Sequence, residues 1–85
     1  MAKLDILYFA WVREAIGKAE EQVDPAPGIT VAGVIDMLAA RGDGYVTAFA
    51  DRDKLRAALD QNFVPLDTPV GDARELAIFP PVTGG

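Results

Sequence analysis

Apolar and polar positions alternate from Lys3 to Val12, and this period of two, filled with branched and aromatic residues, predicts a β-strand. Its two sides would carry Leu4, Ile6, Tyr8 and Ala10 on one and Asp5, Leu7, Phe9 and Trp11 on the other. After Asp5 both sides are apolar, so the strand either is covered on both faces or offers one face to a partner.

The next residues predict a helical turn and a short strand. Val12 and Ile16 lie four positions apart and Gly17 is placed as a C-terminal stop, which favours one helical turn over Arg13 to Lys18. Val23 stands in a mostly polar run from Ala19 to Asp24, which is typical of a short edge strand. We therefore expect a first hairpin.

A helix is predicted from Val31 to Arg41, preceded by a Pro-Gly loop and followed by Gly42 and Gly44. Thr30 can cap it, and its apolar positions recur at helical spacing at Val31, Val34, Ile35 and Leu38. Gly33 inside this helix costs up to ~1 kcal/mol relative to alanine. It either allows close packing against the sheet or is a tolerated surface glycine.

The stretch from Tyr45 to Asp60 carries two patterns at once. It is rich in helix formers, yet Leu55, Ala57 and Leu59 alternate as a strand would. Turn residues at Gln61-Asn62 and farther on separate it from a buried type of strand over Glu75 to Phe79. The order of elements predicts an α+β fold with one main helix packed on one face of a sheet.

Composition and charge exclude several classes of function. We expect eighty-five residues to form one domain. No apolar run approaches the roughly 20 residues that span a bilayer. Asp5 interrupts the apolar run near the N-terminus, which is not typical of a secretory signal. We expect a cytoplasmic protein without a membrane partner. The net charge of −5 is opposite to that of proteins that bind phosphate backbones, so nucleic acid is not an expected partner.

The chain contains neither Cys nor His. This removes thiol nucleophiles, disulfides, zinc sites of the Cys/His type and the usual general base near neutral pH. Ser is also missing, and the carboxylates are scattered over segments that we expect to be exposed. We expect neither independent catalysis nor a metal site.

The C-terminal sequence Phe79-Pro80-Pro81-Val82-Thr83-Gly84-Gly85 predicts a projecting tail. The two prolines have no backbone donors and favour a polyproline-like course, so the chain would leave any sheet at Phe79. The two glycines have no Cβ, so an active-site channel could close around them and use the terminal carboxylate. The alternative is a frayed, tolerated end. We divide the chain into a domain over residues 1–79 and an extended tail over 80–85.

Two segments, Phe9 to Glu14 (FAWVRE) and Phe79 to Gly85 (FPPVTGG), resemble motifs of a known family. They match the FAxxRE and C-terminal FPPVTGG patterns of the small subunit of molybdopterin synthase, a ubiquitin-like sulfur carrier of molybdenum cofactor synthesis. The resemblance covers essentially the whole chain. It implies a β-grasp fold with a mixed sheet, in which Leu55 to Asp60 is a strand. Asp60-Gln61 departs from the Asn-Gln common in the family, which leaves the turn geometry there open.

The resemblance also implies that the chain is a non-catalytic subunit whose reactive residue is Gly85. An E1-like adenylating enzyme would use ATP and a metal ion to form an acyl-adenylate there, and a sulfur donor would convert it to a covalent thiocarboxylate. Activation is needed because a terminal carboxylate, with a pKa of about 3.5, is an unreactive anion at neutral pH. The tail would then deliver sulfur to a cyclic pyranopterin precursor inside the large catalytic subunit, in a heterotetramer of two small and two large subunits.

Further site residues follow from the same resemblance. Those of the tail that would contact the partner are Gly84, Thr83, Val82, Pro81 and Pro80. The apolar partner surface would consist of Phe79, Phe9 and Phe63, with Arg13 as a polar anchor on its rim. The alternatives are phenylalanines that form the core and an arginine that is merely solvated. Trp11 would mark the interface if it were exposed and would not if it were buried.

Three other functions stay open. The chain could carry sulfur for thiamine or another sulfur-containing product. It could be a protein modifier whose tail forms isopeptide bonds to lysines, or an interaction module of the same fold with an unused tail.

Overall fold

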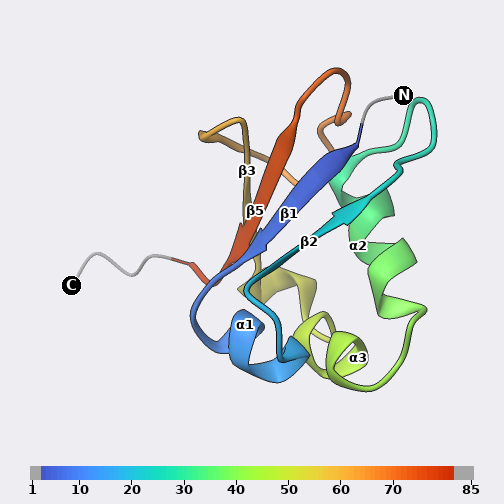
Figure 1. Cartoon of the computed structure of the whole chain (residues 1–85). Coiled ribbons are helices and arrows are strands. Elements are labelled where there is room, and N and C mark those ends of the chain that lie inside the picture. The colour runs from blue at the N-terminus through green and yellow to red at the C-terminus, as the bar shows by residue number, and fades with distance from the viewer. Residues whose placement is uncertain (1–2, 82–85) are drawn as a thin grey trace.

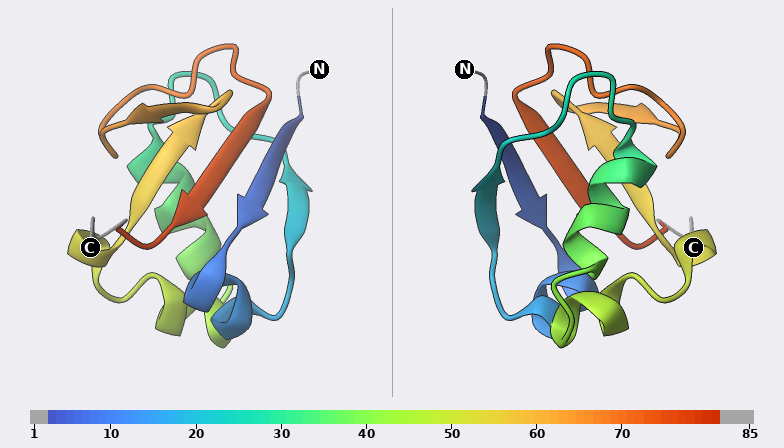
Figure 2. Two further views of the ribbon diagram at one scale, coloured as in Figure 1. Left: turned by 90° about the vertical axis from the view of Figure 1, so that its left-hand side faces the viewer. Right: turned by 90° about the vertical axis from the view of Figure 1, so that its right-hand side faces the viewer.

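The computed structural model describes residues 3–81, and in it a five-stranded sheet carries its main helix on one face (Figures 1 and 2). The strands are β1 Leu4–Tyr8, β2 Glu20–Val23, β3 Arg56–Leu59, β4 Asn62–Val64 and β5 Glu75–Phe79. The helices are α1 Ala10–Ile16, α2 Val31–Ala39 and α3 Gly44–Ala48, with a short 3-10 helix, η1, at Arg52–Lys54. Within residues 3–81, no helix has the length and apolarity needed to cross a bilayer.

The sheet is mixed, with the strand order β2-β1-β5-β3-β4. β1 and β5 lie parallel in its middle, and the other neighbours pair antiparallel, so β2 and β4 form the two edges. α2 crosses one face, while α1 and α3 lie together at one end of the sheet (Figure 1). The predicted α+β order, with one main helix on one face, is confirmed.

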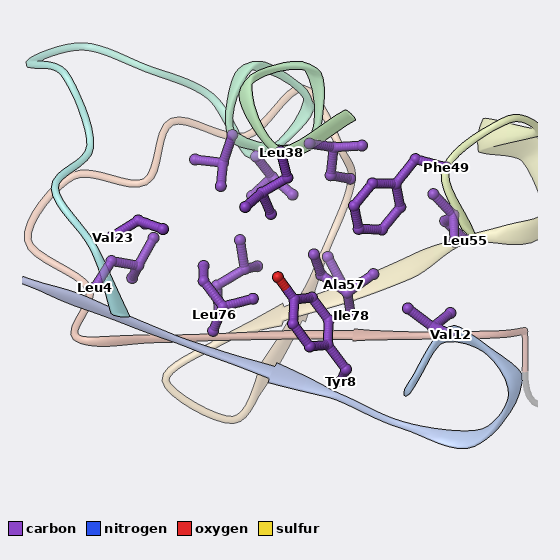
Figure 3. Close-up of a cluster of buried hydrophobic side chains, with 14 of the residues drawn as sticks. Leu4, Tyr8, Val12, Val23, Leu38, Phe49, Leu55, Ala57, Leu76 and Ile78 are labelled. Atoms are coloured by element: carbon purple, nitrogen blue, oxygen red, sulfur yellow. The ribbon is translucent and has the colours of Figure 1, made fainter. Parts of the chain in front are cut away.

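The core lies between the sheet and α2 (Figure 3). Because side chains alternate along a strand, each strand turns every second residue toward the helix. The fully buried side chains of β1, β5 and α2 are Leu4, Ile6, Tyr8, Leu76, Ile78, Val31, Val34, Ile35 and Leu38. Burying one such aliphatic side chain contributes roughly 1.5–3 kcal/mol, so this layer is the main source of stability.

The strand predicted from Lys3 to Val12 is wrong at its C-terminal end. β1 stops at Tyr8, Phe9 caps α1 in an extended conformation, and Ala10 turns the chain with a φ of 52°. Val12 is completely buried, and Ile16, one turn later, packs against the core. The helical spacing of Val12 and Ile16 therefore decides the structure of this segment, although the alternation of apolar residues continues into it. α1 ends at Gly17, which has a left-handed φ of 86°, at the predicted stop.

α2 begins as predicted, because the Thr30 side chain accepts a hydrogen bond from the backbone N–H of Gly33 at 3.0 Å. It ends at Ala39, two residues before the predicted end. A Cβ on Gly33 would lie 2.6 Å from the Ile29 side chain. The absence of a side chain at Gly33 therefore makes room for Ile29, in the loop before the helix. Both predicted alternatives, close packing against the sheet and a tolerated surface position, are wrong.

The ambiguous stretch from Tyr45 to Asp60 contains both predicted structures in succession. Its first part forms α3, a short η1 follows, and β3 begins at Arg56, within the strand that the family resemblance implied. α3 starts at Gly44, where a Cβ would collide with the backbone carbonyl of Ala15 in α1. Only glycine permits this close approach of the two short helices.

Candidate functional site

The face of the sheet opposite α2 has an apolar centre. The strand register aligns Leu7 with Ala77, Ala77 with Ala58, and Ala58 with Phe63, so one row of apolar residues crosses four strands. Toward the β2 edge the face turns polar, because Leu7 pairs with Glu20. Of the two options for the first strand, the structure shows the second, with one face covered by α2 and the other open.

Three phenylalanines extend this apolar row toward the end of β5. Phe63 is 76% exposed and Phe9 is 46% exposed, and the rings of Phe63 and Phe79 contact each other in a tilted arrangement, with centroids 5.3 Å apart and planes inclined by 44°. All three line one hollow of about 530 Å³ together with Leu7, Ala58, Gln61, Glu75 and Ala77. We call the apolar members of this set the aromatic face: Leu7, Phe9, Ala58, Phe63, Ala77 and Phe79.

The structure thus brings together the three phenylalanines that the sequence singled out. The alternative prediction, that the phenylalanines form the core, is wrong for Phe9 and Phe63, which are exposed. Phe79 is half-buried. The buried aromatic rings are instead those of Tyr8 and Phe49 (Figure 3). A group of exposed aromatic side chains is typical of a protein-binding surface. The geometry therefore supports a partner role for the three phenylalanines, and this role stays a prediction.

The tail leaves the sheet beside the aromatic face. Phe79, the last residue of β5, pairs with Arg56, and the Phe9 N–H donates to the Ile78 carbonyl at 3.2 Å. Pro80 and Pro81 follow outside regular structure, as expected of residues that cannot donate to the ladder. The remaining predicted tail residues, Val82, Thr83, Gly84 and Gly85, lie outside the described residues.

Arg13 and Trp11 lie on α1, next to this face. The Arg13 N–H donates to the Phe9 carbonyl at 3.3 Å, which places Arg13 one helical turn from Phe9. Its side chain is exposed, but Arg13 does not line the hollow of the aromatic face. Trp11 is 39% exposed, so it meets the condition stated for an interface residue.

Asp60 and Gln61 form the two-residue turn between β3 and β4, in the left-handed conformation with φ of 48° and 72°. One Asp60 oxygen, Oδ1, accepts hydrogen bonds from the backbone N–H groups of Arg74 and Glu75, at 3.0 and 3.1 Å. The carboxylate ties this turn to the start of β5 and holds Gln61 at the rim of the aromatic face. This settles the turn geometry that the departure from Asn-Gln left open.

A polar cluster around Glu21 escaped the sequence analysis. The Glu21 carboxylate accepts hydrogen bonds from Tyr8 at 2.7 Å, Tyr45 at 2.6 Å and Arg41 at 2.6 Å. Burial alone would raise the pKa of Glu21, but the hydrogen bonds from Tyr45, Tyr8 and Arg41 outweigh it and lower the pKa to about 2. Burial and the neighbouring Glu21 carboxylate raise the pKa of Tyr8. No local motif announces such a cluster, because its members come from four separate segments.

Comparison with known proteins agrees with this architecture. Residues 6–85 match the ThiS family. The chain belongs to the ThiS family. It is 42% identical over 82 residues to the molybdopterin synthase sulfur carrier subunit of Escherichia coli (strain K12). The alignment covers 96% of this chain and 99% of that protein.

Solved structures also share the fold. The chain is similar to SAMP1 from Haloferax volcanii, with a TM-score of 0.73, 26% identity, and coverage of 99% of this chain and 100% of the other. The ubiquitin of Caldiarchaeum subterraneum matches with a TM-score of 0.61 at 16% identity, over 99% of this chain and 98% of the other. The predicted β-grasp, ubiquitin-like fold is confirmed.

Proposed function

We propose that this chain is the sulfur carrier subunit of a molybdopterin synthase in molybdenum cofactor biosynthesis. The observation that carries this proposal is the similarity to a protein of that name over 96% of this chain and 99% of that protein, in a chain that contains the FPPVTGG motif. The active site lies in the large subunit, and this chain supplies the sulfur. We place both subunits in the cytoplasm, two copies of each per complex.

The chemistry centres on Gly85. An E1-like enzyme, with ATP and a metal ion, joins the Gly85 carboxylate to AMP and releases pyrophosphate. Hydrosulfide released by a sulfur donor then attacks the acyl carbon, and the bond to AMP breaks. This leaves a thiocarboxylate, AMP and a proton, with no change of oxidation state. Since the chain has no Cys and no His, no thiol or imidazole of its own competes for the activated carbonyl.

The aromatic face explains how the sulfur reaches its destination. It lies beside the exit of the tail at Phe79, so a partner that covers it also receives Pro80 and the residues that follow. Exposed phenylalanines supply the buried anchors that dominate such interfaces, and Arg13 supplies a polar contact near Phe9. We propose that Pro80 to Gly84 line the channel of the large subunit and that Gly85 reaches its active site.

The test is the intact mass of the chain after incubation with ATP, the activating enzyme and a sulfur donor. We expect the mass increase of one oxygen-to-sulfur replacement at the C-terminus. Omitting ATP, or deleting Gly85, should abolish the increase. The deletion should leave the thermal transition nearly unchanged, because it removes none of the side chains of the hydrophobic core. An unchanged mass of the wild-type chain with all components present would refute the proposal.

A role as a protein modifier is the second candidate, and the similarity to SAMP1 of Haloferax volcanii, which is named small archaeal modifier protein 1, favours it. The same activated Gly85 would then form isopeptide bonds with lysines. Conjugates of higher mass in cell lysate that disappear on deletion of Gly85 would support this function. A chain found only free or bound to the large subunit would oppose it.

A further inference from the structure

A second hollow lies at the β4 edge of the sheet, next to the aromatic face. It has a volume of about 460 Å³ and is lined by Arg56, Ala57, Phe63, Val64, Pro65 and Phe79. We call it the β4 groove. Phe63 and Phe79 line this groove and the hollow of the aromatic face alike, so their contacting rings form a ridge between two neighbouring hollows. A partner on the aromatic face therefore reaches the β4 groove by crossing one pair of rings.

Arg56 is the charged residue among the six that line the groove. Its Nη1 donates to the backbone carbonyls of Leu55 at 2.8 Å and Asp53 at 3.1 Å, which fixes the guanidinium beside the end of η1. A guanidinium has five N–H donors, so those on Nε and Nη2 remain for a ligand. Backbone carbonyls thus hold the positive guanidinium of Arg56 beside the apolar residues that line the groove.

The use of Arg56 differs from that of two other arginines. Arg41 pairs with Glu21 at 2.6 Å and Arg52 pairs with Asp36 at 2.8 Å. None of the ion pairs formed within residues 3–81 includes Arg56. Arg56 is therefore a positive group that backbone carbonyls hold in place and that has no carboxylate partner among the described residues.

We infer that the β4 groove binds an acidic, apolar segment of the protein partner, with an apolar side chain in the hollow and a neighbouring Asp or Glu on Arg56. The inference rests on the proposed function, since the partner is the large subunit. A carboxylate fits the planar fork of a guanidinium with two parallel hydrogen bonds. Arg56 is exposed in the free chain, so water leaves this pair only when the partner segment covers it together with Phe63, Val64 and Phe79. In the complex the pair is then stronger than an ion pair on the open rim.

The test compares the affinity of the large subunit for the wild-type chain and for three variants, by calorimetry at low and at high salt. We expect R56E to weaken binding at least ~30-fold and R56Q about 10-fold at both salt concentrations, because a pair in a water-excluded groove is weakly screened. K54E is the matched control: Lys54 is exposed on η1 and does not line the groove. It should weaken binding less than ~3-fold, and only at low salt.

Three further measurements separate binding from folding and identify the segment. Thermal unfolding of R56Q checks that loss of the two carbonyl contacts leaves the domain folded, and R56K, which keeps the charge without the fork, should recover part of the affinity. A photoreactive residue in place of Val64 should cross-link to a partner peptide that contains Asp or Glu next to an apolar residue.

The outcomes distinguish this inference from the proposed function. A wild-type complex that R56E weakens no more than K54E does would overturn the inference alone, as would a cross-linked peptide without an acidic residue. A wild-type chain that forms no complex with the large subunit would overturn both.

Discussion

Glu21 is a single side chain that joins several parts of the fold. Its oxygens accept from Tyr8 on β1, Tyr45 on α3 and Arg41 beyond the end of α2, and its side chain is only 11% exposed. Hydrogen bonds to an ionised group are about twice as strong as neutral ones. The cluster therefore stabilises the end of β1 from which Phe9 projects.

The lowered pKa of Glu21 predicts a dependence of stability on acid. Its folded pKa of about 2 lies below the ordinary value of 4.5, so its stabilising contribution is present above about pH 4.5 and is lost as the pH falls toward 2. E21Q should cost ~1–3 kcal/mol at pH 7 and flatten the decline in acid. Urea unfolding of both proteins across this pH range measures it, and parallel pH curves would contradict the assignment.

Gln61 carries backbone strain in the turn between β3 and β4. Its φ of 72° costs a residue with a Cβ roughly 1 kcal/mol, which glycine does not incur. Q61G should raise the free energy of unfolding by ~0.5 kcal/mol, since the greater freedom of glycine in the unfolded chain offsets part of the gain. The control E14G, in helix α1, should lower it by up to ~1 kcal/mol. Equal losses in both variants would show that the turn is not strained.

At the scale of elements, β5 serves both faces of the sheet. Leu76 and Ile78 point into the core with no exposed surface, while Ala77 and Phe79 belong to the aromatic face. One strand thus links the stability of the domain to the surface from which the tail leaves.

The division between the two faces of the sheet predicts opposite effects for a substitution on β4 and one on β5. F63A should weaken binding of the large subunit by ~10- to 100-fold but change the free energy of unfolding by less than ~1 kcal/mol, because Phe63 is 76% exposed. I78A should cost ~2–5 kcal/mol of stability, because it opens a cavity in the core. Calorimetric binding and chemical denaturation provide the two numbers. A strongly destabilised F63A would place Phe63 in the core after all.

The predictability of each element depends on how local its signal is. β5 has the bounds predicted for it, Glu75 to Phe79, because alternation and the following prolines act within one short segment. The strand was predicted to run four residues beyond the C-terminal end of β1, because the alternation continues into α1. The packing of α1 against α3, which decides the end of β1, cannot be read from the local sequence. The split of Tyr45 to Asp60 into helix and strand likewise needs tertiary contacts to decide it.

At the scale of the whole molecule, the parts proposed to act on partners gather on the face of the sheet away from α2 and at its β4 edge. The aromatic face, the tail exit at Phe79 and the β4 groove adjoin one another there. Phe9 and Phe79 could be singled out from the sequence because each lies in a contiguous motif. Arg56 and Glu21 could not, since the role of each depends on neighbours that only folding supplies.

The central claim is that Gly85 carries sulfur to a partner's active site. The most direct measurement is the intact mass of the thiocarboxylated chain in complex with the large subunit, before and after the pyranopterin precursor is added. The account predicts that the mass returns to that of the carboxylate only when both the large subunit and the precursor are present. A thiocarboxylate that persists in the complete mixture would contradict it.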